Sequence, residues 1–178
     1  NVPANATTFT VRVPTIDDTS LEGPETVQLT AGTAQNTTPV AGIGTILDND
    51  GIVVRIGDAD VAEGQDLVFD VTFSTTSANP VELNFTVTPS GANPIEANDI
   101  GTMVVRDSFG NVLTANANGS YTVPANATGV TVTIPSIQDN VYEGRETFTL
   151  SATSPTFGVT TGDTGQGTIR DDGTGGPP

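Results

Sequence analysis

The chain has 178 residues and carries 21 Asp and Glu against five basic residues, which gives a formal net charge of −16 at pH 7. This charge makes nucleic acids and anionic membrane surfaces poor partners and makes cations good ones. The chain has no Cys and no His, which excludes disulfides, thiolate chemistry and the commonest general base. Oxygen atoms are therefore the ligands that the chain offers to a metal ion.

A long internal repeat organises the chain. Residues 2–31 match residues 123–152 without a gap, and after a slip of two positions residues 42–50 match residues 165–173. A repeat of this length is a whole domain in tandem, because a solenoid repeat is far shorter. We therefore expect 1–50 to be the C-terminal half of one repeat, 51–172 to be a complete repeat, and 173–178 to be a Gly/Pro linker or tail.

Residues 1–50 are expected to supply the last three strands of a repeat, at 9–13, 26–31 and 44–47. Three strands alone would leave one apolar face in water. We therefore expect this half-repeat to self-associate with a neighbouring chain or to pack on the complete repeat. The alternative is a natural boundary at this point with a permuted strand order. The chain starts with no signal-peptide pattern and has no long apolar run, so we expect an internal part of a longer protein that does not insert into a membrane.

Within 51–172 the apolar residues alternate with a period of two, which is typical of half-buried strands. Gly, Pro, Asn and Asp separate the alternating runs, and no window shows helical spacing. Short strands at this spacing predict an all-β, antiparallel, seven-stranded Ig-like sandwich. We expect the strands at 52–56, 66–73, 81–88, 102–106, 129–134, 146–152 and 166–170.

Carboxylates gather in the connections between the predicted strands. In a seven-stranded sandwich the loops after strands one, three and five and the exit of strand seven share one end, so their acids should converge. Converging carboxylates repel one another unless a hard cation binds, and irregular loops rich in oxygen favour calcium over magnesium. The alternative is that these are solvated loop acids that serve turns. The acids placed together are Glu63, Asp99, Asp139, Glu143, Asp171 and Asp172.

The order of the motifs VAEG, NDI, IQDNVYEGRE and GTIRDD resembles the Calx-β domain family. The resemblance implies a Calx-β sandwich and makes the six converging acids calcium ligands. Glu146 begins an alternating strand, so it is either a further ligand or a solvent-facing acid. The same motif recurs in the first half-repeat as IDDTSLEGPE followed by DND, which implies a half-site made of Asp17, Asp18, Glu22, Asp48 and Asp50.

Three positions depart from the family pattern. Gln138 and Gly173 stand where the family carries Asp, and Ile100 stands where it usually carries Tyr. Because each lost carboxylate weakens the site, we expect one or two ions per domain, with affinities of ~10⁻⁴ to 10⁻³ M as in extracellular modules.

We do not expect an enzyme, since the chain has no Trp and only two Tyr for a substrate cleft, and the acidic motif occurs twice. The resemblance implies a calcium-binding spacer domain of a large repetitive bacterial adhesin outside the cell, with neighbouring repeats as partners and Ca²⁺ at the domain junctions. Two alternatives remain open. The segment 107–121 could bind a glycan or protein receptor, or the domain could be an intracellular calcium sensor.

Overall fold

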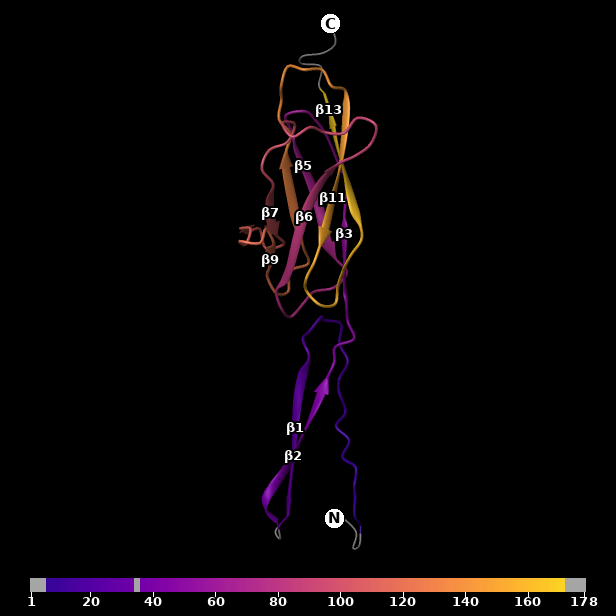
Figure 1. Ribbon diagram of the computed structural model, residues 1–178, viewed down its shortest axis with the longest axis vertical. Coiled ribbons are helices and arrows are strands. Elements are labelled where there is room, and N and C mark those ends of the chain that lie inside the picture. Colours follow the sequence, from indigo (N-terminus) through magenta and orange to yellow (C-terminus); the bar gives the residue numbers. More distant parts are fainter. Residues whose placement is uncertain (1–5, 34–35, 172–178) are drawn as a thin grey trace. The chain divides into compact units, whose positions relative to one another are not determined.

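The computed structural model describes residues 6–33 and 36–171, and its regular elements in these ranges are β-strands (Figure 1). No helix in these ranges is long and apolar enough to cross a membrane. The chain divides into two compact units, the first made of residues 1–19 and 24–47 and the second of residues 20–23 and 48–178. The all-β class predicted from the alternating pattern is confirmed.

In its described residues the first unit contains one pair of antiparallel strands, β1 (Glu25–Thr33) and β2 (Asn36–Ile46). The third strand expected at 9–13 is wrong, because described residues 6–18 form no strand. The repeat counterpart of 9–13 is β10 (Gly129–Pro135), which pairs with β5 (Asp66–Phe73) and β7 (Val104–Asp107). The described residues of the first unit offer no counterpart of β5 or β7, so 9–13 has no partner for its backbone hydrogen bonds.

The second unit is a sandwich of two sheets, and all seven predicted strands occur in it. The first sheet has the order β12-β3-β5-β10-β7-β8, which adds β3 (Ile52–Ile56), β8 (Val112–Leu113) and β12 (Val159–Thr161) to the strands above. The second has the order β4-β13-β11-β6-β9, made of β4 (Ala59–Ala62), β13 (Thr164–Arg170), β11 (Arg145–Thr153), β6 (Val81–Pro89) and β9 (Tyr121–Val123). The pairings are antiparallel except for β12 with β3 and β13 with β4.

The core lies between the two sheets and is built from alternate residues of each strand. Phe69 on β5 and Phe148 on β11 are fully buried, with ring centroids 5.8 Å apart and planes at 59°. Gly167 on β13 lies opposite Phe148, where an added Cβ would fall 2.3 Å from the ring. Because Gly167 has no side chain, it leaves the space that the buried ring of Phe148 occupies.

The segment 107–121 is held by hydrogen bonds of its own. The carboxylate of Asp107 accepts hydrogen bonds from the backbone N–H groups of Phe109 and Asn111 at 2.9 Å each. The carboxylate of Glu82 on β6 accepts hydrogen bonds from the hydroxyls of Ser120 and Thr122. These contacts hold Asp107, the one acid in the sequence of this segment, and link the segment to Glu82 on β6, while its role as a receptor-binding loop stays a prediction.

Candidate metal site

The acidic loops meet at the end of the second unit where β13 finishes. The backbone N–H of Glu63, after β4, donates to the carbonyl of Arg170 at 2.8 Å. The N–H of Ile137, after β10, donates to the carbonyl of Asp99 at 2.8 Å, and the N–H of Asp171 donates to the carbonyl of Gly144 at 3.0 Å. These backbone contacts bring together the four connections that the sequence placed at one end of the sandwich.

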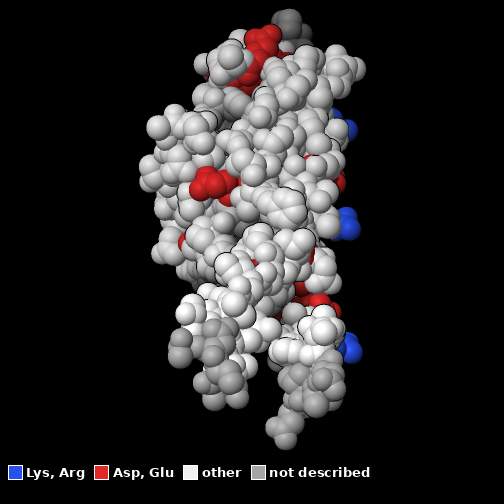
Figure 2. Space-filling view, turned by 60° about the horizontal axis from the view of Figure 1, so that its bottom comes forward, with Lys and Arg blue, Asp and Glu red and all other residues white. Residues whose placement is uncertain are grey.

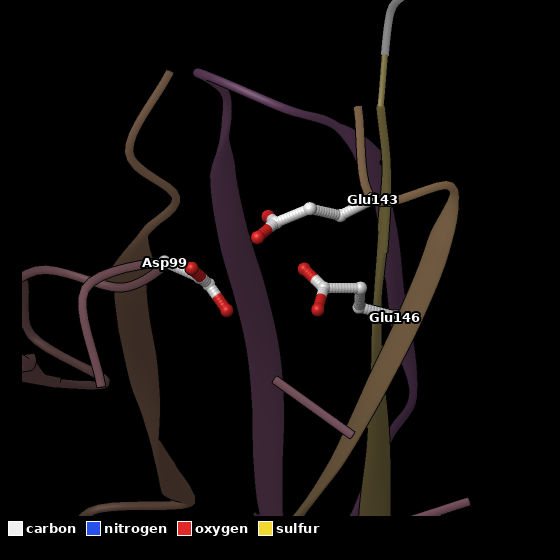
Figure 3. A group of neighbouring side chains, drawn as sticks. All are labelled: Asp99, Glu143 and Glu146. Carbon is white, nitrogen blue, oxygen red and sulfur yellow. The ribbon is translucent and has the colours of Figure 1, made fainter. Parts of the chain in front are cut away.

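Three carboxylates form a cluster at this end. Asp99, Glu143 and Glu146 each offer one oxygen, and these oxygens lie within 4.8 Å of one another. Their carboxylates converge from three parts of the chain, namely the β6–β7 connection, the β10–β11 loop and β11 itself (Figure 3). Asp99 is 6% exposed and Glu146 is 5% exposed, while Glu143 is half-buried. We call these three residues the acidic cluster.

Glu146 points inward because of the strand period. It shares the buried parity of β11 with Phe148, Leu150 and Ala152, so its side chain faces the core side of the sheet. The sequence left Glu146 as either a ligand or a solvent-facing acid. The structure shows that it is not solvent-facing. Its parity with Phe148 was the sequence signal that could have decided this.

Residues close to Asp99 in the sequence help to hold the acidic cluster in position. The side chain of Asp99 accepts a hydrogen bond from the backbone N–H of Glu96, which closes a tight turn. The amide of Asn93 donates to the carbonyl oxygens of Glu143 at 2.8 Å and Arg145 at 3.3 Å. Glu96 and Asn93 were not predicted from the sequence, although both lie in the same polar segment as Asp99.

Burial and mutual repulsion raise the pKa values of two acids of the cluster. Burial, and then the negative charges of Asp99, Glu143, Glu96 and Glu63, raise the pKa of Glu146 from its usual 4.5 to about 7. Burial is also the largest cause that raises the pKa of Glu143, followed by the charges of Asp99, Asp139, Glu96 and Glu63. Figure 2 shows acidic side chains gathered near the top of the view, while the basic side chains visible on this face lie along its right-hand edge. A bound cation would remove this repulsion.

Three other predicted ligands surround the cluster and use their carboxylates to hold the loop. Glu63 accepts hydrogen bonds from the amide of Gln138 at 3.0 Å and from the backbone N–H of Asp139 at 3.1 Å. Asp139 accepts one from the N–H of Val141 at 2.6 Å, and Asp171 accepts one from the N–H of Glu143 at 3.0 Å. The structure therefore places these acids beside the cluster without bringing their oxygens into it. Asp172 lies outside the described residues.

Gln138 shows what the departure from the family pattern does. Its amide donates a hydrogen bond to the carboxylate of Glu63 at 3.0 Å, at the position to which the sequence resemblance assigns an Asp. An amide hydrogen bond satisfies Glu63 without adding a negative charge. The expected number of ions stays a prediction.

The half-site predicted in the first repeat stays a prediction, because Asp17 and Asp18 belong to the first unit and Glu22, Asp48 and Asp50 belong to the second. Asp17 and Asp18 are exposed, and so is Glu25, the repeat counterpart of Glu146. Glu25 is exposed because the described residues of the first unit form no second sheet that could cover β1. Asp48 accepts hydrogen bonds from the backbone N–H groups of Glu22 at 2.6 Å and Asp50 at 3.0 Å, and these bonds lower its pKa.

Comparison with known proteins gives the fold. No family model and no curated protein matches the sequence. Among solved structures, the apo-form Calx CBD1 domain matches with a TM-score of 0.52 and 17% identity, over 69% of this chain and 99% of that chain. The structure of CBD12 from CALX1.2 matches with a TM-score of 0.51 and 17% identity, over 68% of this chain and 46% of that chain. The chain therefore contains a β-sandwich of the Calx-β type.

Proposed function

We propose that the second unit is a calcium-binding domain whose ion binds at the acidic cluster. The observation that carries the proposal is that oxygens of Asp99, Glu143 and Glu146 lie within 4.8 Å of one another, with two of the three side chains buried. A buried group of carboxylates with raised pKa values is costly unless a cation binds there. The resemblance to Calx CBD1 in fold supports the same proposal.

Calcium suits this donor set better than the other common ions. The chain has neither Cys nor His, so the sulfur and imidazole ligands that zinc and copper favour are absent. The cluster draws on two loops and one strand, an irregular geometry that calcium tolerates and magnesium does not. Glu63, Asp139 and Asp171 lie in the adjoining loops and are the residues that would complete or support the coordination.

The proposed role of the ion is structural. It joins the β6–β7 connection to the β10–β11 loop and to β11, and so stabilises the end of the sandwich rather than activating a substrate. The repeat and the high negative charge support a spacer domain in a large extracellular adhesin, in which calcium makes each repeat rigid. At a concentration about ten times its Kd, an ion that binds the folded state adds ~1.4 kcal/mol of stability.

Thermal unfolding with millimolar calcium and with a chelator tests the proposal. We expect calcium to raise the midpoint of the second unit, and a Glu143→Gln, Glu146→Gln double variant to lose that response. The matched control is Asp70→Asn, which removes the charge of an exposed acid on β5. If calcium leaves the unfolding midpoint of the natural sequence unchanged, the proposal that this domain binds calcium is wrong.

The extracellular spacer role needs its own experiment. Antibodies raised against the second unit should label intact, non-permeabilised cells of the source organism. Labelling that requires permeabilisation would instead support an intracellular role.

A further inference from the structure

Leu21 is a core residue of the second unit, although the sequence repeat assigns it to the half-repeat before that unit. It is 4% exposed and packs with the buried apolar residues of the sandwich. Residues 20–23 belong to the second unit as a whole, while the residues on either side of them belong to the first. A side chain from one repeat thus completes the core of the sandwich that follows it.

The residues around Leu21 form a defined socket. The backbone N–H of Leu21 donates to the carbonyl of Thr76 at 3.3 Å, and its carbonyl accepts hydrogen bonds from the N–H of Ala78 and the hydroxyl of Ser77 at 3.2 Å each. Gly158 lies against the side chain, since a Cβ added there would fall 2.6 Å from a methyl carbon of Leu21. The socket thus combines main-chain pairing with an apolar space that a glycine keeps open.

The loop that presents Leu21 is supported in the same way in both repeats. Asp48 accepts a hydrogen bond from the N–H of Glu22, and its counterpart Asp171 accepts one from the N–H of Glu143. The residue before the donating glutamate is Leu21 in the first copy and Tyr142 in the second. The two loops therefore share this hydrogen bond as well as their sequence pattern.

The two equivalent side chains differ in what covers them. Tyr142 is 49% exposed, and its neighbour Val141 is 57% exposed. We propose that Tyr142 is a docking residue, and that its occupant is the socket of a further sandwich of this class, formed by the counterparts of residues 76–78 and Gly158. The internal repeat carries this inference, because it shows the same loop position already buried in such a socket. The proposal does not depend on calcium.

Tyr142 differs from Leu21 in the size and polarity of its side chain. Tyr is larger than Leu and carries a hydroxyl that needs a hydrogen-bond partner when buried. Because Gly158 lies directly against Leu21, we expect a leucine to fit this chain's own socket better than a tyrosine does, so that Tyr142 binds it more weakly than Tyr142→Leu would. An experiment that uses this chain's own socket should therefore compare the natural Tyr142 with the variant Tyr142→Leu.

The test uses a lengthened chain in which residues 1–170 are followed by a second copy of residues 48–178. Because the natural sequence has no Cys, one introduced cysteine reports its own burial through its rate of reaction with a thiol reagent. We expect Tyr142→Cys in the first copy to react at least about tenfold more slowly in the lengthened chain than in the natural-length chain, as for a site exposed only by local opening. The labelling is run with chelator and with calcium.

Two control variants make the labelling decisive. Leu21→Cys should be protected in both chains, since its socket is present in both. Phe109→Cys, at a side chain that is 60% exposed on the β7–β8 turn, should react rapidly in both. Equal, fast labelling of Tyr142→Cys in the two chains, with Leu21→Cys protected, would overturn the proposal.

A second measurement removes the dependence on cysteine. With Tyr121→Phe in both copies and Tyr142→Phe in the second copy, Tyr142 of the first copy is the one tyrosine left. Acrylamide should quench its fluorescence less in the lengthened chain than in the natural-length chain, and Tyr142→Leu should raise the unfolding midpoint of the lengthened chain alone. The absence of both changes would also overturn the proposal.

Discussion

Glu146 shows how one residue can link strand geometry to ion binding. The alternation of β11 places its carboxylate on the buried face, within reach of Asp99 and Glu143. Burial and four negatively charged neighbours then favour its protonated form. A proton and a cation are therefore alternative ways to relieve the same repulsion.

This competition predicts a pH dependence of stability without calcium. The pKa of Glu146 is about 7 in the folded chain against 4.5 as its ordinary value. Because the folded state binds the proton more tightly, this stability is fully present below pH 4.5 and is lost as the pH rises through 7. The loss is up to about 3 kcal/mol, at about 1.4 kcal/mol per pKa unit. Urea unfolding in chelator at pH 5 and pH 8 measures it.

Glu146→Gln is the control for the pH effect, because glutamine has nearly the same shape and does not titrate. We expect this variant to lose most of the difference in unfolding free energy between pH 5 and pH 8. An equal difference in the natural sequence and in the variant would assign the pH dependence to other groups. With saturating calcium the order should reverse, since the proton then competes with the ion.

Substitution by alanine should have a large effect on stability at Leu21 and a small one at Tyr142. Leu21→Ala should destabilise the second unit by about 2–4 kcal/mol, because it opens a cavity in the sandwich core. Tyr142→Ala in the natural-length chain should stay within about 0.5 kcal/mol of the natural sequence, since its side chain is half exposed. Urea unfolding of the two variants measures both. Equal effects would show that residues 20–23 are not part of the sandwich core.

The limits of sequence reasoning at the site are seen in particular residues. The topology of an antiparallel sandwich was enough to place Glu63, Asp99, Asp139, Glu143 and Asp171 at one end. It could not separate Asp99 and Glu143, whose oxygens converge, from Glu63, whose carboxylate binds Gln138 and the backbone of Asp139. That difference depends on side-chain hydrogen bonds within irregular loops, which have no sequence period.

At the scale of elements, the two copies of the last hairpin have one register. Glu25 pairs with Ile46 and Leu29 with Gly42 in the first unit, and the counterparts Glu146 with Ile169 and Leu150 with Gly165 pair in the second. The local sequence therefore determines the hairpin whether or not a second sheet covers it. The strand expected at 9–13 fails for the opposite reason, because its counterpart β10 depends on partners from a distant part of the chain.

The glycines of these hairpins give an element-scale prediction. Gly167→Ala should cost about 1–3 kcal/mol, because the new methyl group would overlap the ring of Phe148 in a fully packed core. The matched control is Gly44→Ala in the first unit, where the neighbour is Val27 and the added Cβ would lie 3.3 Å from it. We expect a lower midpoint of urea unfolding for the first variant alone. A similar loss for both would point to backbone conformation rather than to packing.

At the scale of the whole molecule, the two units differ in how far their apolar side chains are buried. In the second unit, alternate residues of each main strand are buried between two sheets. In the first unit, Val27 is 37% exposed, Leu29 is 45% exposed and Val11 is 48% exposed, and their counterparts in the second unit are core residues. An apolar face of this kind usually marks a surface that binds a partner.

The expectation that residues 1–50 mediate self-association can be tested on this face. Sedimentation velocity over a range of chain concentrations should detect a reversible dimer, and Val27→Thr with Leu29→Thr should weaken it. Val68→Thr, at a side chain that is 48% exposed on the outer face of β5, is the matched control and should not change the association. A sedimentation coefficient that does not vary with concentration would instead favour a chain whose first unit stays uncovered.

The dependence of the association on salt concentration distinguishes an apolar interface from a charged one. The chain carries a net charge of −16, so two copies repel one another at low ionic strength. Salt at ~0.5 M shortens the Debye length to a few ångströms and suppresses this repulsion without weakening apolar burial. Association through the face of Val27 and Leu29 should therefore strengthen with added NaCl. An association that weakens with salt would require ion pairs between the copies, and the interface would then have to include the few arginines of the chain.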